Sequence, residues 1–336
     1  MKILVLSLAI LIPLGLCCKP QLREIIDSSQ GLNNPFGVTF DKQGNTFIAE
    51  YEGGRIFKLD KSGKLVQISG DGKKGFAGDG MPASHGVFNG MHNLAWSSKK
   101  ILYISDTHNH LVRKIDLKTN LISTFAGTPN NNGFSGDGGP ATEAKLNTPI
   151  SISLTPNEKT MLISDISNSR IRAIDLDSGI IRTIAGNGKR GKPADNSLAI
   201  EQPLIGPRAA IMDNSGNLFI LERNGNALRV VRPNGKIYTL AGTGERGNQD
   251  GPALKSTFNG PKHFCFDKKG NIVIADDKNQ LIRLYNPKTK SVSTILGGKA
   301  MPRTVLNRPH GVALAGDGGI WVCDSGNNRI LILKNH

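Results

Sequence analysis

One unit of sequence recurs six times along this chain, and that repetition constrains the fold more than any other feature. Each unit opens on a turn that usually contains proline, runs through an apolar strand, and turns at a polar, glycine-containing segment into a second apolar strand. The equivalent turn positions are Pro35, Met91, Pro149, Pro207, Pro261 and Pro309, which lie 56, 58, 58, 54 and 48 residues apart. Such a period indicates a repeat architecture that stacks its units around one axis.

The remainder of each unit supplies two further strands. An acidic residue and a short polar turn follow the second strand and lead into a third, as in 106–113 and 165–172. A fourth strand follows in 122–127 and 181–186. Because four short strands make one blade of a propeller, we expect an all-β fold, a six-bladed β-propeller with four strands per blade, over residues 19–336.

The pattern resembles the NHL-repeat family. Residues 109–111 read Asn-His-Leu, the triplet that gives the family its name, and related units cover the chain from about residue 22 to its end. The linker 134–147, echoed at 76–83 and 249–254, resembles the spacers of bacterial and teneurin-like NHL propellers. The resemblance implies the same six-bladed ring.

The ends of the chain predict how the ring closes. The sixth unit stops at Leu333 after three strands, whereas residues 22–27 precede the first unit and have the pattern of a lone fourth strand. We expect this N-terminal strand to complete the last blade. Closure of this kind removes the open sheet edges that favour aggregation.

The first 18 residues have the features of a signal peptide, a single Lys2 followed by an apolar run that ends at Cys17 and Cys18. We therefore expect cleavage near residues 17–18 and an extracytoplasmic protein: periplasmic, cell-surface or secreted. The two cysteines resemble the lipid-attachment cysteine of bacterial lipoproteins. A lipid anchor at Cys17 or Cys18 stays open as the one membrane attachment that the sequence suggests.

The charge balance favours an acidic partner. The chain has 42 Lys and Arg against 27 Asp and Glu, a formal net charge of +15. We expect an anionic glycan, an envelope component or an acidic protein as partner of a monomeric propeller. Export, and scattered lysines with few aromatic residues between them, argue against nucleic acid.

Six acidic residues end the second strands and are interpreted as structural. They are Glu50, Asp106, Asp165, Glu222, Asp276 and Asp324. A catalytic group is expected once, whereas a repeated turn needs a carboxylate in every copy to accept backbone N–H groups and to pair with a nearby cation. In the linkers, Asp137 is expected to cap a short helix that contains Pro140, and the linkers are expected to shape the mouth of the channel.

The candidate site lies where the repeat varies. The first strand of each blade lines the central channel of a propeller, so the residues after the opening turn converge at its mouth. From these positions we select His92, Asn93, Arg208, Lys262, His263 and His310 as ligand-binding residues. We expect a non-enzymatic binding or interaction module for an anionic ligand, glycan or protein, without catalytic residues or a cofactor.

The alternative is a metal-dependent lyase or hydrolase. Peptidyl-amidoglycolate lyases of the NHL type hold zinc with three channel histidines, and the resemblance implies His92, His263 and His310 as the set here. His263 is offset by one position, and Arg208 occupies the matching place in the fourth blade. Lactonase propellers hold a divalent metal such as calcium with acidic and amide side chains, of which Asn93 is the one candidate. Cys265 and Cys323 are expected as small buried side chains, and their pairing is left open.

Overall fold

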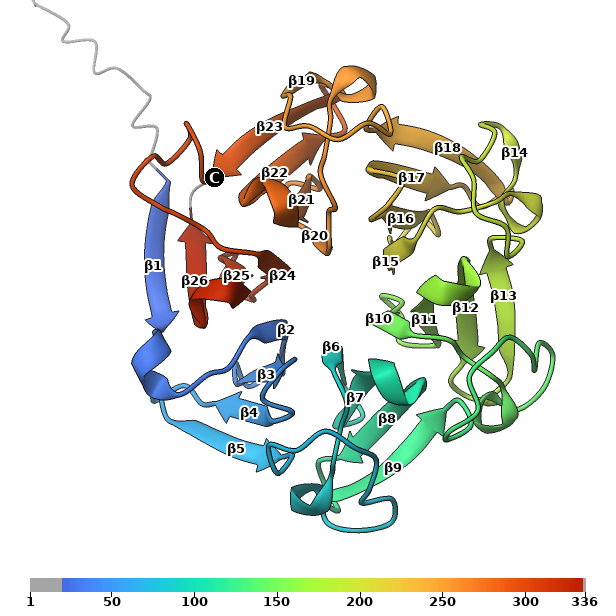
Figure 1. The fold of residues 1–336 in the computed structure, drawn as a ribbon, viewed down its shortest axis with the longest axis vertical. Helices are drawn as coiled ribbons and strands as arrows, with labels where there is room; N and C mark the ends of the chain where they lie inside the picture. The colour runs from blue at the N-terminus through green and yellow to red at the C-terminus, as the bar shows by residue number, and fades with distance from the viewer. Residues whose placement is uncertain (1–19, 335–336) are drawn as a thin grey trace, which may run out of the picture.

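A computed structural model describes residues 20–334, which form six antiparallel sheets arranged as blades around a ring (Figure 1). Blade 1 consists of β2 (Pro35–Phe40), β3 (Thr46–Glu50), β4 (Ile56–Leu59) and β5 (Leu65–Ser69). Blade 2 consists of β6 (Met91–Ser97), β7 (Ile101–Asp106), β8 (Leu111–Asp116) and β9 (Leu121–Ala126). Blade 3 consists of β10 (Pro149–Leu154), β11 (Thr160–Asp165), β12 (Arg170–Asp175) and β13 (Ile181–Ala185).

The other three blades follow the same order. Blade 4 consists of β15 (Pro207–Met212), β16 (Leu218–Glu222), β17 (Ala227–Val231) and β18 (Lys236–Ala241), with an added β14 (Ser197–Leu198). Blade 5 consists of β20 (Phe264–Phe266), β21 (Ile272–Asp276), β22 (Leu281–Asn286) and β23 (Ser291–Leu296), with an added β19 (Gly251–Pro252). Blade 6 consists of β24 (Pro309–Leu314), β25 (Ile320–Asp324), β26 (Arg329–Lys334) and β1 (Gln21–Ile26).

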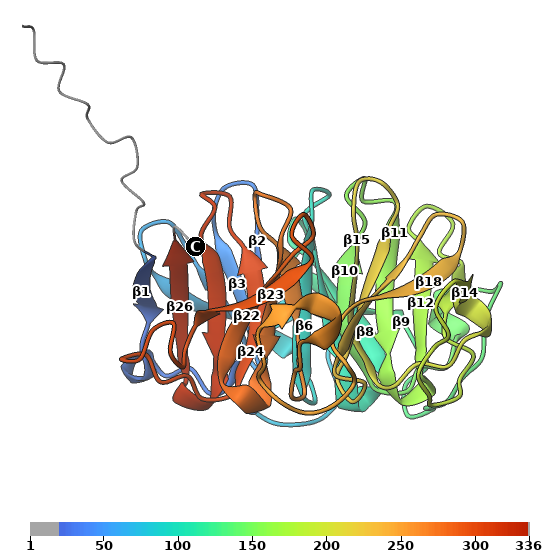
Figure 2. The same ribbon diagram turned by 90° about the horizontal axis from the view of Figure 1, so that it is seen from above.

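Short 3-10 turns punctuate the described chain. After the second strands come η3 (Thr107–Asn109), η5 (Ile166–Asn168), η8 (Asp277–Asn279) and η9 (Ser325–Asn327). The linkers carry η2 (Ala83–His85), η4 (Ala141–Glu143), η6 (Ala199–Glu201) and η7 (Ala253–Lys255), and η1 (Ser28–Gln30) follows β1. The turns η3, η5, η8 and η9 all lie on the face toward the viewer in Figure 1, which is the lower face in Figure 2.

The N-terminal strand closes the ring, as expected. β1 pairs antiparallel with β26, with Leu22 opposite Leu333, and Figure 1 shows the first strand of the chain beside the last. An ion pair of 3.2 Å between Arg329 and Glu24 adds to this seam. The predicted strand over 22–27 is therefore confirmed, with a shift of one residue.

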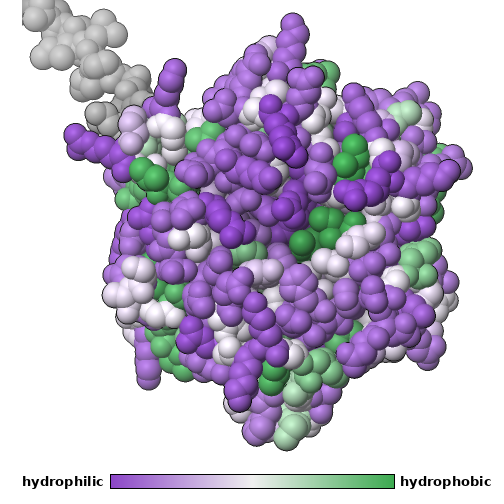
Figure 3. Space-filling model, viewed as in Figure 1, coloured by the Kyte–Doolittle hydropathy of each residue, from purple (hydrophilic) through white to green (hydrophobic). Residues whose placement is uncertain are grey.

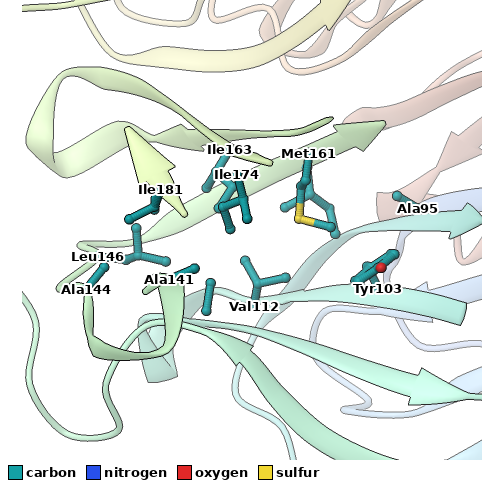
Figure 4. Packing of buried hydrophobic residues seen from close by; sticks show 12 residues of the cluster. Ala95, Tyr103, Val112, Ala141, Ala144, Leu146, Met161, Ile163, Ile174 and Ile181 are labelled. Atoms are coloured by element: carbon teal, nitrogen blue, oxygen red, sulfur yellow. The ribbon is translucent and has the colours of Figure 1, made fainter. Parts of the chain in front are cut away.

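The core lies between the blades rather than within one layer. Six clusters of buried apolar residues each combine side chains from two neighbouring blades. Figure 4 shows the one between blades 2 and 3, where Tyr103 and Val112 face Met161, Ile163 and Ile174. Because neighbours cover both faces of a blade, β3 and β21 are buried at every residue, which explains their continuous apolar sequence.

The six acids are structural, as expected. Each is buried, and each accepts a hydrogen bond from the backbone N–H of a residue shortly before its blade, such as 2.7 Å from Asn89 to Asp106 and 2.7 Å from Asn147 to Asp165. The other four bonds run from Asn33 to Glu50, Ile205 to Glu222, Asn259 to Asp276 and Asn307 to Asp324. Each acid thereby ties its blade to the linker that enters it.

The expected helix cap at Asp137 is wrong. The residue that precedes η4 is Pro140, which makes no capping side-chain bond, whereas Asp137 accepts a 2.7 Å hydrogen bond from Arg172. Arg172 is fully buried and also lies 3.5 Å from Asp165. In the same way, Arg113 forms an ion pair with Asp79, and Arg283 forms one with Asp250. Ion pairs with buried arginines therefore hold the Gly-Asp linkers against their blades.

The linkers cover the outer edges of the blades. β14 pairs with β18, β19 pairs with β23, and single bridges join Pro82 to Leu121 and Pro140 to Ile180. The Gly-Asp segments thus lie against the outermost strands rather than at the channel mouth, whereas other linker residues, such as Thr148 and Arg190, line a pocket there. Covering these edges protects strands that would otherwise be open to pairing with another chain.

Three expectations concern the termini and the cysteines. The signal peptide over 1–18, with Cys17 and Cys18, lies outside the described residues. Within 20–334, no helix is long and apolar enough to cross a membrane. Cys265 and Cys323 are buried and unpaired, and burial raises the pKa of both thiols.

Candidate functional site

Two rings of side chains meet at the channel mouth on the face that carries the 3-10 turns after the second strands. The inner ring comes from the first strands, as expected. The outer ring was not predicted. It comes from the residue that follows each of the six acids at the ends of the second strands: Tyr51, Thr107, Ile166, Arg223, Asp277 and Ser325. The residue type at these positions differs from blade to blade, although the acid before it recurs in all six. This contrast between a variable and a recurrent position could have identified the outer ring from the sequence.

Members of the two rings contact each other within a blade. Phe36 stacks on Tyr51 with 4.5 Å between ring centroids and 11° between planes. Nδ1 of His92 lies 2.9 Å from the Thr107 hydroxyl, and Nζ of Lys262 lies 3.4 Å from a carboxylate oxygen of Asp277. The antiparallel pairing of first and second strands places these partners side by side.

Deeper in the channel, Asn93 and His263 join opposite blades. Nδ1 of His263 lies 3.1 Å from the carbonyl oxygen of Val312 and must donate to it, so Nε2 accepts from Asn93 at 3.2 Å. Asn93 in turn accepts from the N–H of Ile152 at 3.2 Å. Burial, with Arg208 nearby, lowers the pKa of His263 to about 4. These two side chains therefore brace the ring from within.

Arg208 and His310 form the second link between blades. Arg208 is 1% exposed, and its Nη2 lies 2.7 Å from Nε2 of His310. A guanidinium only donates, so Nε2 accepts and His310 is neutral. Burial and then Arg208 hold the pKa of His310 well below its usual value. Nε of Arg208 is buried without a hydrogen-bond partner among residues 20–334, and the pKa of Arg208 falls to about 9 because of burial.

Lys262 and Asp277 are both buried, at 5% exposure each, and they lie close enough to form an ion pair. Burial and then Arg208 lower the pKa of Lys262 to about 7. Asp277 adds an acid to the channel mouth, where the first-strand positions supply none. One carboxylate nevertheless faces the cationic groups of Lys262, Arg208 and Arg223, so the electrostatic balance there remains positive.

A pocket of about 420 Å³, which we call the mouth pocket, opens beside these residues. Its lining includes Tyr51, His92, His108, Ile150, Ile166, Arg190 and Arg223. The Tyr51 hydroxyl and Nε2 of His108 are 3.0 Å apart. Figure 3 shows this face of the ring, with hydrophilic side chains around the centre and a hydrophobic patch next to it.

Two other cavities are features of the repeat. One of about 670 Å³ lies between blades 4 and 5, and one of about 330 Å³ lies between blades 1 and 2. Equivalent residues line them, such as Asp213 and Phe219 in the first and Asp41 and Phe47 in the second. Because the packing of neighbouring blades leaves a cavity at the same position in two blade pairs, we attribute both cavities to the scaffold and not to a functional site.

The imidazoles do not fit a metal site in this arrangement. His92 donates through Nδ1 toward Gly90 and Thr107, Nε2 of His310 accepts from Arg208, and both nitrogens of His263 are engaged. Residues 20–334 hold no group of three or more His, Cys, Asp and Glu side chains placed to bind a metal ion. Zinc requires at least three such ligands in fixed geometry.

Known proteins share the repeat and the fold. The model of the NHL repeat matches residues 306–333. NHL repeat-containing protein 2 of Gallus gallus is 26% identical over 89% of this chain and 46% of its own length. The chloroplastic protein SUPPRESSOR OF QUENCHING 1 of Arabidopsis thaliana is 28% identical over 79% of this chain and 27% of its own length. The chain therefore spans less than half of these curated relatives.

Among solved structures, selenomethionine-substituted virginiamycin B lyase of Staphylococcus aureus aligns with a TM-score of 0.61 at 15% identity. The alignment covers 94% of this chain and 99% of that one. At this identity the likeness shows the fold alone. The six sequence units, the six blades and the NHL-repeat match over residues 306–333 agree with one another, and together they support an NHL-repeat β-propeller.

Proposed function

We propose that this propeller is an exported, non-enzymatic binding module that takes an anionic ligand at the mouth pocket. The observation that supports this most is the excess of cations at the pocket: Arg190 and Arg223 line it, and Arg208 lies beneath it against the backbone of Ile150. The NHL propeller fold also supports a role in binding or interaction, without indicating which ligand is bound.

The buried cations gain from an anion. Burial lowers the pKa of Arg208 and Lys262 because a charge removed from water is costly unless an opposite charge compensates it. An anion at the mouth offsets part of that cost. The same field attracts acidic ligands from solution, an effect that weakens as salt rises.

Three classes of partner supply a suitable acidic group: an anionic glycan, an envelope component or an acidic protein. The size of the mouth pocket is at the lower end of the roughly 300–1,000 Å³ typical of small-molecule sites. The pocket therefore suits one terminal group of a larger partner or one small molecule.

The alternative function, a metal-dependent lyase or hydrolase, requires His92, His263 and His310 to exchange their present hydrogen bonds for a metal. Elemental analysis of protein purified without chelator tests it. Stoichiometric zinc or calcium would favour the enzyme over the binding module, and the loss of that metal in His92→Ala would place it at the mouth.

Equilibrium binding of glucuronate tests the proposal, because this probe carries one carboxylate on a compact polar body. Arg223→Glu reverses a pocket charge, whereas Arg182→Glu makes the same change on the exposed outer strand β13. We expect Arg223→Glu to weaken binding about tenfold, in line with a lost charge-assisted hydrogen bond. Equal affinity of the two variants would reject the mouth pocket as the site.

A further inference from the structure

The two sides of the mouth pocket differ in chemistry. Tyr51, His92, Ile150 and Ile166 supply flat aromatic and aliphatic surface, whereas Arg190 and Arg223 supply guanidinium groups. A pocket with one apolar side and one cationic side suits a ligand with the matching division. Hydroxyl and amide groups complete the lining, from Thr148, Ser167, Ser169 and Asn224, so the apolar surface occupies one part of a mostly polar pocket.

The aromatic side is held rigid before any ligand binds. Tyr51 stacks on Phe36, which stacks on His310 at 3.6 Å with 14° between the planes. The edge of His92 packs on Tyr51 at 4.8 Å, and His108 bonds the Tyr51 hydroxyl. This stack runs from the buried channel wall out to the pocket. A preorganised surface costs little entropy when a flat group packs against it.

The cationic side is free to bind. Within residues 20–334, the guanidinium groups of Arg190 and Arg223 make neither an ion pair nor a side-chain hydrogen bond. Five arginines of the third strands contrast with them, because each of the five contacts one or more carboxylates: Arg113, Arg172, Arg229, Arg283 and Arg329. These five arginines are thus engaged within the frame of the propeller, whereas the guanidinium groups of Arg190 and Arg223 are available to a ligand.

From these two sides we infer that the ligand is an amphipathic anion, an aromatic carboxylate. Its ring packs along Tyr51, Ile150 and Ile166, and its carboxylate reaches the guanidinium fork of Arg223, with Arg190 at the rim. This inference rests on the proposed function, because it names the ligand class of the same pocket. The available volume, about 420 Å³, admits one ring with a short acidic arm.

Three matched probes separate the parts of this inference: phenylacetate has ring and charge, acetate has the charge alone, and benzyl alcohol has the ring alone. We expect phenylacetate to bind at least about tenfold more tightly than either of the others in calorimetric titration. Burying one ring and pairing one carboxylate are each expected to contribute about tenfold in affinity.

Two substitutions assign the contributions to the two sides of the pocket. Ile166→Asn lowers affinity for phenylacetate about fivefold or more and leaves that for acetate unchanged, whereas Arg223→Gln weakens both. Ile166 is partly exposed in η5, so the variant is expected to fold, and its thermal midpoint is measured alongside.

The outcomes separate the two claims. Equal affinity for phenylacetate and acetate would overturn the aromatic class and leave anion binding in place. Equal affinity for phenylacetate and benzyl alcohol, or no binding of either acid to the wild-type protein, would overturn both the ligand class and the anionic site.

Discussion

Nη2 of Arg208 lies 2.7 Å from Nε2 of His310, so a fully buried cation of blade 4 is hydrogen-bonded to a neutral imidazole of blade 6. His310 in turn stacks on Phe36 of blade 1. The channel wall is therefore continuous across blades that are distant in the sequence. Its charge state depends on histidines that stay neutral when folded.

The first prediction is a loss of stability in acid. Burial holds the pKa of His92 and His310 well below 6.5 and lowers that of His263 to about 4. Below pH 6.5 the unfolded chain binds protons that the folded channel excludes. The histidine contribution is thus fully present above 6.5 and is lost as pH falls toward 4.

Buried carboxylates act in the opposite direction. Burial raises the pKa of Asp106, Asp165 and Asp276 to about 6, so between their unfolded value of 3.8 and 6 the folded state binds more protons. A comparison between the wild type and His310→Gln cancels this background. We expect the variant to lose less stability than the wild type from pH 7 to pH 5 in urea unfolding, and parallel losses would contradict the neutral His310.

The second prediction concerns the ion pairs that hold the linker of blade 3. Arg172→Met leaves the buried carboxylate of Asp165 without its cation and should cost about 3–5 kcal/mol of unfolding free energy. Asp137→Asn removes an exposed partner of the same arginine and should cost about 1 kcal/mol or less. Chemical denaturation measures the loss of unfolding free energy in both variants. A similar loss in the two would show that the buried Arg172–Asp165 pair is not the main source of stability at this linker.

The third prediction concerns closure. Removal of residues 22–33 takes away β1 and opens the edge of β26, so the thermal midpoint should fall and the protein should associate with itself. Ile26→Ala is the milder variant, because it empties a fully buried site at the seam and should cost about 2–5 kcal/mol. A truncated protein with the wild-type midpoint would refute the role of β1.

The ring, its blade number and its closure were predictable from the sequence because they depend on a pattern repeated six times. Each unit has an acid 15 or 16 residues after its opening turn, so Asp106 and Asp165 could be assigned to the frame before their backbone partners were known. The N-terminal strand was predictable because the last unit lacked its fourth strand.

The contacts of the site were harder to predict because they join residues far apart in sequence. Asn93 meets His263, 170 positions away, and Arg172 reaches Asp137 in the preceding linker. The residues next to Asp137 in the sequence favoured a helix cap, and they contained no information on its contact with Arg172. Tyr51, Arg223 and Asp277 were missed because only the first strands were expected to reach the mouth.

The fourth prediction is that Arg223→Gln affects anion binding, whereas Arg208→Gln affects the stability of the fold. Arg223 is partly exposed and has no ion-pair partner within 20–334, so Arg223→Gln should change the thermal midpoint little while it weakens anion binding about tenfold. Arg208→Gln should lower the midpoint, because it removes the bond to His310 and leaves a gap in the channel wall. Equal midpoints for the two variants would contradict the division of roles.

The central claim is that an anion binds in the mouth pocket, and the histidine signals in an NMR titration with phenylacetate test it most directly. His92 and His108 line the pocket, whereas His85 is exposed on the linker of blade 2 and serves as an internal reference. The account predicts saturable shifts of the His92 and His108 imidazole signals with His85 unchanged. Signals that stay in place, or a His85 shift of the same size, would contradict it.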